Sequence, residues 1–154
     1  MITKISRTLR VSFLTAAFVF ALSVTASSAE YVNVINDGVN VRTGPGTSNP
    51  VYMELFSGYP LKVIEEKDNW LKVTDFEEDS GWIYAPLTQK CDTVIVDVSS
   101  KANMRSGPTT QDGVIATVER GVVLELVSRK SEWVEVKHRS GTQGWIYAPL
   151  VWPR

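Results

Sequence analysis

The heptapeptide GWIYAPL at residues 81–87 occurs again, unchanged, at residues 144–150. A shift of 63 positions aligns residues 40–87 with residues 103–150 without a gap, and 18 of these 48 positions are identical. Because the identities are spread along the whole segment, they indicate duplication of one domain rather than reuse of a short motif.

Within each copy the apolar residues recur at every second position, which is the spacing of strands with one buried face. The residues predicted to point inward are Val39, Val41, Leu61, Val63, Leu71, Val73 and Ile83, followed by Ala102, Met104, Leu124, Leu126, Val134, Val136 and Ile146. Turn signals such as Gly44-Pro45-Gly46 separate the runs, and helical spacing is not found in them. The pattern predicts an all-β fold in which each copy forms a small five-stranded barrel.

The motifs of each copy, taken in order, resemble the bacterial SH3-like (SH3b) domain family. The first copy has NVRTGPG at residues 40–46, then Gly58, then a strand that begins at Trp70, and it closes on GWIYAPL. The resemblance covers residues 31–88 and 94–151. It implies two tandem, partly open SH3-like barrels and a role in targeting to the cell wall or envelope, often beside a separate enzyme domain.

The first 29 residues have the layout of a secretory signal peptide. Basic residues are followed by an apolar run over residues 11–26, and Ser27-Ser28-Ala29 places small residues where a signal peptidase requires them. We expect cleavage before Glu30 and a periplasmic or secreted product that is not inserted in the membrane. A retained anchor is disfavoured because the run is shorter than the roughly 20 strongly apolar residues of a spanning helix. The predicted division is therefore signal peptide 1–29, first domain 30–88, linker 89–93 and second domain 94–154.

The charge of the mature chain argues against a nucleic-acid partner. Three of the 16 basic residues lie in the predicted signal, which leaves 13 against 17 acidic residues, a net charge of −4. The two copies also differ, because residues 30–91 hold 5 basic and 10 acidic side chains whereas residues 92–154 hold 8 and 7. Binding to nucleic acid depends on basic surfaces, so the net negative charge disfavours such a partner. The uneven charge predicts that the two copies present different surfaces to a partner.

The alternation that turns Leu71 and Ile83 inward turns aromatic side chains outward. Clustered outward aromatic rings form grooves for extended peptides in such barrels. The candidate ligand-binding residues are Trp70, Tyr84, Trp133, Tyr147, Arg42 and Arg105. The alternative for the four rings is packing at a barrel end or between the copies, and the sequence leaves both interpretations open.

Some conspicuous residues have a structural interpretation that we favour. The two arginines could bind a carboxylate of a wall peptide, but hydrogen bonds to carbonyls of their own loops are the better interpretation. Trp82 and Trp145 stand beside a turn glycine and are expected to pack. The acidic stretch 77–79 is expected to be a solvated hairpin tip rather than a cation site.

The sequence predicts binding rather than catalysis. His138 is the only histidine and Cys91 the only cysteine, and they lie in different segments, so no nucleophile with a base is recognised. Cys91 is interpreted as a tolerated thiol in the linker. No motif predicts a cofactor or a metal.

Two functions from different classes remain. The first is an exported binding module whose two domains recognise peptidoglycan or extended peptides of the cell envelope. The second is a structural or adaptor protein that binds an envelope protein partner, and this partner supplies the activity.

Overall fold

The computed structural model describes residues 30–154, so the predicted signal peptide lies outside the described residues. The first unit, residues 31–90, contains β1 (Tyr31–Val34), β2 (Val39–Arg42), β3 (Val51–Leu55), β4 (Pro60–Lys67), β5 (Trp70–Thr74), β6 (Ser80–Tyr84) and β7 (Thr88–Lys90). The second unit, residues 93–152, contains β8 (Thr93–Val96), β9 (Lys101–Arg105), β10 (Val114–Glu119), β11 (Val123–Lys130), β12 (Trp133–Lys137), β13 (Gln143–Tyr147) and β14 (Val151–Trp152). Two short 3₁₀ turns, Ala85–Leu87 and Ala148–Leu150, are the described helical segments.

Each unit is one antiparallel sheet, and the two sheets have the same strand order. The orders are β3-β2-β6-β5-β4-β1-β7 and β10-β9-β13-β12-β11-β8-β14. The all-β prediction and the two tandem units are confirmed, but each sheet has seven strands where five were expected. The terminal strands β7 and β14 have only 3 and 2 residues, too few to show a periodic pattern.

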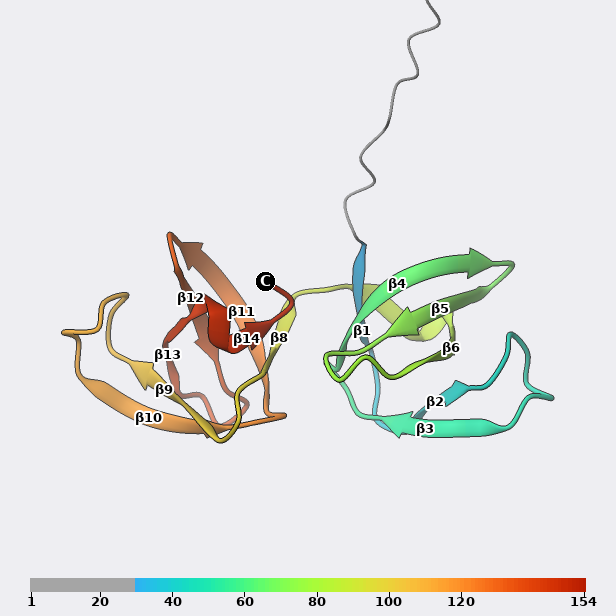
Figure 1. Cartoon of the computed structure of the whole chain (residues 1–154), viewed down its shortest axis with the longest axis horizontal. Coiled ribbons are helices and arrows are strands. Elements are labelled where there is room, and N and C mark those ends of the chain that lie inside the picture. The colour runs from blue at the N-terminus through green and yellow to red at the C-terminus, as the bar shows by residue number, and fades with distance from the viewer. Residues whose placement is uncertain (1–29) are drawn as a thin grey trace, which may run out of the picture.

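Each sheet curls over its own core (Figure 1). The pair β2–β3 joins the rest of the first sheet through a single register pair, Arg42 with Trp82, and the pair β9–β10 joins through Arg105 with Trp145. Where so few pairs connect two parts of a sheet, the parts can bend across each other and enclose side chains between them.

Most residues that the alternation predicts to point inward are buried, whereas Val63 and Leu126 are half-buried. The cores also contain residues outside the prediction, among them Val32, Leu55 and Val94. Ile83 and Ile146 are both 0% exposed, and Val73 and Val136 on the neighbouring strands are buried beside them. Trp70 and Tyr84 are register partners on β5 and β6 in the first unit. Trp70 is half-buried and Tyr84 is exposed. The two small cores therefore consist mainly of aliphatic side chains.

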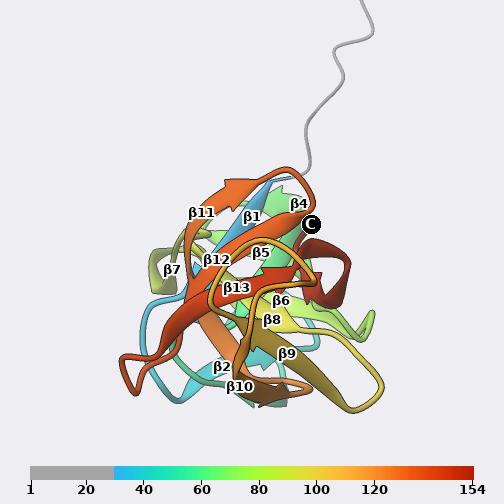
Figure 2. The same ribbon diagram turned by 90° about the vertical axis from the view of Figure 1, so that its left-hand side faces the viewer.

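The two units contact each other through β4 and β8. Figure 2 looks along the pair, with the second unit in front of the first. The buried amide of Asn33 donates hydrogen bonds to Asp92 and Thr93, and the Thr93 hydroxyl donates to the carbonyl of Gly58 at 2.6 Å. Ile95 of the second unit packs in the core of the first. Since these contacts join β1 and the β3–β4 turn to β8, the short linker is held by side-chain bonds on both sides.

A charged contact also joins the units. Arg120 lies in the β10–β11 turn, and its guanidinium bonds the Glu77 carboxylate at 2.7 Å while it lies over the Phe76 ring at 4.9 Å. The acidic tip of the first unit, expected to be solvated only, therefore also meets a cation of the second unit.

Two glycines at equivalent turns allow a test of the interface. Gly58 and Gly121 both have a φ of +81°, but a Cβ on Gly58 would lie 3.3 Å from Val123, whereas a Cβ on Gly121 would have no neighbour within 4 Å. We expect Gly121→Ala to cost about 1 kcal/mol through backbone strain alone. Gly58→Ala is expected to cost more, because it also presses on the neighbouring unit. Denaturant unfolding of both variants measures the difference, and equal costs would contradict a close interface at Gly58.

A buried polar pair lies inside the first unit. Asp75 is 5% exposed, and it accepts hydrogen bonds from the Tyr59 hydroxyl at 3.1 Å and from the backbone N–H groups of Glu77 and Asp79. The carboxylate therefore shapes the hairpin tip. Burial, and then the charge of Asp75, raises the pKa of Tyr59 above its ordinary value of 10.0.

This pKa shift predicts a loss of stability at high pH. Between the ordinary pKa and the raised one, the unfolded chain loses the Tyr59 proton while the folded chain keeps it. The unfolded state then binds fewer protons, so the free energy of unfolding falls as the pH rises above about 10. Tyr59→Phe is expected to weaken this fall, and urea titrations at pH 9 and pH 11 compare the two proteins. An unchanged pH dependence in the variant would contradict the assignment.

Candidate functional site

A groove in the first unit is built around Trp70 and Tyr84. These residues are register partners on β5 and β6, and their ring centroids lie 5.5 Å apart at an interplanar angle of 54°. The groove has a volume of about 660 Å³, and its other wall contains Asn36, Asp37 and Asn40 around the β1–β2 turn. Tyr84 is 38% exposed, so its ring is available to a ligand.

The second unit has a groove of the same construction. Trp133 and Tyr147 are register partners on β12 and β13, and their centroids lie 5.6 Å apart at 58°. The volume is about 550 Å³, and Lys101, Glu132 and Gln111 are among the lining residues. The structure thus brings each predicted aromatic pair together in a groove.

The side chains that line the two grooves differ in charge. The first groove includes the carboxylate of Asp37 and the guanidinium of Arg42, whereas the second includes Lys101 and Arg105 with the opposing carboxylate of Glu132. A ligand segment that suits one groove therefore meets different charges in the other, in line with the uneven charge of the two halves of the sequence.

Both candidate arginines line the grooves and also bond their own loops. Arg42 donates to the carbonyls of Asn49 at 2.7 Å and Thr47 at 3.1 Å, and Arg105 donates to the carbonyl of Asp112 at 2.7 Å. A guanidinium has five N–H donors, so these bonds leave donors for a ligand. Direct binding of a ligand by the arginines stays a prediction. Their hydrogen bonds also hold the loops beside the grooves in place.

The other singled-out residues do not line the two grooves. Trp82 and Trp145 are half-buried. Trp82 is the register partner of Arg42, and Trp145 is the register partner of Arg105. Cys91 is half-buried, burial raises the pKa of its thiol, and the thiol donates to the Thr93 carbonyl. Within residues 30–154, no group of three metal-ligating side chains is found, and none of the helices has the length and hydropathy to cross a membrane.

Sequence reasoning missed the polar walls of both grooves. Asn36 and Asp37 stand in a turn that shows no strand alternation. The only signal available was their position just before the NVR motif at residues 40–42. Their separation from Trp70 along the chain gave no indication that they line one groove with it.

The family model described as bacterial SH3 domain matches residues 36–90 and again residues 98–153. The chain belongs to the bacterial SH3 domain family. Both matches contain the ring pair and the arginine of their groove, so the two grooves are features of two bacterial SH3 domains in tandem.

Curated relatives of this bacterial SH3 protein are longer proteins. The chain is 29% identical over 149 residues to a predicted N-acetylmuramoyl-L-alanine amidase of Bacillus subtilis, YrvJ, with 90% of this chain and 28% of that protein covered. It is 34% identical over 56 residues to a predicted cell wall amidase of Staphylococcus epidermidis, LytH, with 36% and 19% covered. The chain therefore spans between about a fifth and just over a quarter of the length of these relatives.

Solved structures match the chain with low TM-scores. NlpC2 from Trichomonas vaginalis matches with a TM-score of 0.37 and 15% identity, over 84% of this chain and 50% of that one. An NlpC/P60 family protein from Bacillus cereus matches with a TM-score of 0.38 and 12% identity, over 79% and 55%.

Proposed function

We propose that this protein is an exported, non-catalytic binding module whose two bacterial SH3 domains hold peptide segments of the cell envelope, with peptidoglycan as the ligand. The observation that supports it most directly is the repeated ring pair, Trp70 with Tyr84 and Trp133 with Tyr147, each lining a groove. Aromatic rings offer large contact area at a low cost in conformational entropy, which suits flexible peptides.

Several further observations support an envelope ligand. The relatives include proteins named as wall amidases, and the chain matches only the smaller part of their length. The first 29 residues have the pattern of an export signal. The net charge of −4 in residues 30–154 disfavours a nucleic-acid partner.

Sedimentation with purified sacculi tests the proposal. We expect the folded protein to pellet with sacculi at modest salt, and we expect the double variant Trp70→Ala, Trp133→Ala to remain in the supernatant. Circular dichroism of the variant establishes that it is folded. Absence of retention of the folded wild-type protein would remove the wall as its ligand.

A structural or adaptor role is the second candidate. The wall charges of the two grooves differ, which favours a partner with two distinct segments over a uniform polymer. Crosslinking in intact cells separates the two candidates. A single crosslinked protein supports the adaptor, whereas recovery with wall fragments supports the wall binder. Hydrolysis of sacculi by the pure protein would contradict the non-catalytic proposal.

A further inference from the structure

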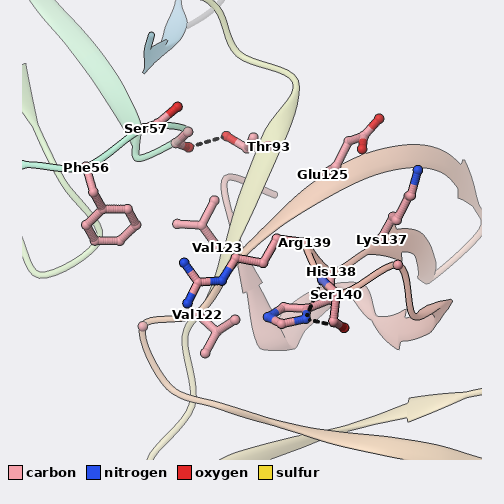
Figure 3. Close-up of a pocket in the computed structure, with 13 residues that line it drawn as sticks. Phe56, Ser57, Thr93, Val122, Val123, Glu125, Lys137, His138, Arg139 and Ser140 are labelled. Atoms are coloured by element: carbon pink, nitrogen blue, oxygen red, sulfur yellow. Dashed lines mark hydrogen bonds between the residues drawn. The ribbon is translucent and has the colours of Figure 1, made fainter. Parts of the chain in front are cut away.

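A third pocket lies between the two units (Figure 3). Its walls are the turn 56–58 of the first unit, Thr93 of β8, residues 121–125 around the start of β11, and the hairpin 137–141 of the second unit. The volume is about 870 Å³. It shares no lining residue with either ring-pair groove.

The internal repeat explains why this space is open. At the equivalent position the first unit has Tyr59, which is 8% exposed, packs edge-on against Phe56 at 5.3 Å and bonds the carboxylate of Asp75. The shift of 63 residues places Val122 at the position of Tyr59 and His138 at the position of Asp75. The second unit therefore has neither an aromatic ring nor an acid at these two positions.

The open space is also basic. Lys137, His138 and Arg139 are consecutive on its wall, and the one acidic lining residue is Glu125. In the described part of the chain, Arg139 forms no ion pair and no side-chain hydrogen bond, unlike Arg120, which is paired with Glu77. Figure 3 shows the Arg139 guanidinium extended between Phe56 and Val122.

The hydrogen bonds of His138 make it a donor toward a ligand. The backbone N–H of Ser140 donates to Nδ1 of His138 at 3.2 Å, and the Ser140 hydroxyl lies 2.8 Å from the same atom. Because Nδ1 accepts the backbone N–H, the neutral ring carries its proton on Nε2. Nε2–H is then free to donate to an anionic oxygen, together with the guanidinium N–H groups of Arg139.

We propose that this pocket binds the C-terminal carboxylate of a peptide. The carboxylate meets Arg139 and Nε2 of His138, and a planar guanidinium matches a carboxylate with two parallel hydrogen bonds. The last side chain of the peptide is apolar and packs on Phe56, Val122 and Val123. This apolar wall favours a peptide over a small inorganic anion. The site is independent of the ring-pair grooves.

Nuclear magnetic resonance on the ¹⁵N-labelled protein tests the proposal with N-acetyl-alanyl-leucine as the probe. Three glycine amides in the lining, those of Gly58, Gly121 and Gly141, serve as reporters. We expect saturable shifts of these amides with the free carboxylate, and at least fivefold weaker binding of the peptide that ends in an amide. Equal binding of the two peptides would overturn the proposal, as would equally tight binding of inorganic phosphate.

Variants locate the binding. Arg139→Gln is expected to lower the affinity for the peptide with a free carboxylate at least fivefold. Lys130→Gln removes one exposed charge outside the pocket and is expected to leave this affinity within twofold of the wild-type value. Val122→Tyr gives the second unit a ring at the position where the first unit has Tyr59, and this variant is expected to abolish the shifts. Binding that Arg139→Gln leaves unchanged would overturn the proposal, even if the tyrosine variant failed to fold.

A further variant distinguishes this site from the proposed wall-binding grooves. Trp70→Ala with Trp133→Ala is expected to leave the glycine shifts intact while sacculus binding is lost. If the peptide binds in the grooves instead, the double variant loses the shifts, and the pocket assignment is wrong.

Discussion

Truncation of Ile83 or Ile146 to Ala is expected to lower the free energy of unfolding by about 2–5 kcal/mol. Each side chain is 0% exposed, and each lies at the centre of a core formed by only ten or so buried residues. The surrounding strands are tied by their hydrogen bonds and cannot close the cavity. The loss is a large share of the stability of such a domain. Thermal and urea unfolding of both variants measure it.

The matched variants are Tyr84→Ala and Tyr147→Ala. Each tyrosine directly follows its isoleucine on the same strand but points to the groove, so its removal opens little cavity. We expect a cost of about 1 kcal/mol from the lost contact with the partner tryptophan, together with weaker ligand binding. If the tyrosine variants melt as early as the isoleucine variants, the rings are structural and the groove assignment fails.

Loss of one groove is expected to reduce the apparent affinity for sacculi by about 10²-fold or more. Two linked sites bind a repetitive polymer more tightly than either site alone, because the second binding event occurs at a high effective concentration. Trp70→Ala and Trp133→Ala each leave one groove intact, so each single variant should keep only the weak binding of one site. Sedimentation at graded sacculus concentrations gives the apparent affinities.

Tyr52→Ala is the control for this experiment. Tyr52 is a large aromatic residue, 51% exposed, on the edge strand β3 and outside both grooves. Its removal is expected to leave sacculus binding unchanged. Unaltered binding by either single tryptophan variant would contradict a tandem mechanism, because the groove of that variant would then contribute nothing.

The strand alternation identified most of the core and the two ring pairs because it is a local property. A residue and its neighbour on a strand point to opposite faces whatever the rest of the chain does. Ile83 and Tyr84 are therefore separated by the sequence itself. The 63-residue repeat then transferred the same assignment to Ile146 and Tyr147.

The polar groove walls and the extra strands could not be obtained in this way. Asp37 and Trp70 line one groove although 33 residues separate them along the chain, and only a single register pair joins β2 to β6 between these parts of the sheet. Strands β7 and β14 are defined by their pairing with β1 and β8 rather than by any pattern of their own.

The sequence by itself determined that this protein has two all-β units of one family and which face of the long strands each side chain occupies. The tertiary structure decided how the units meet and what their meeting creates. The aligned repeat shows that the second unit has Val122 where the first has Tyr59. The consequence of this difference depends on Phe56 of the first unit, which lines the same pocket as Val122. Such contacts join residues far apart in the chain, and local periodicity carries no information about them.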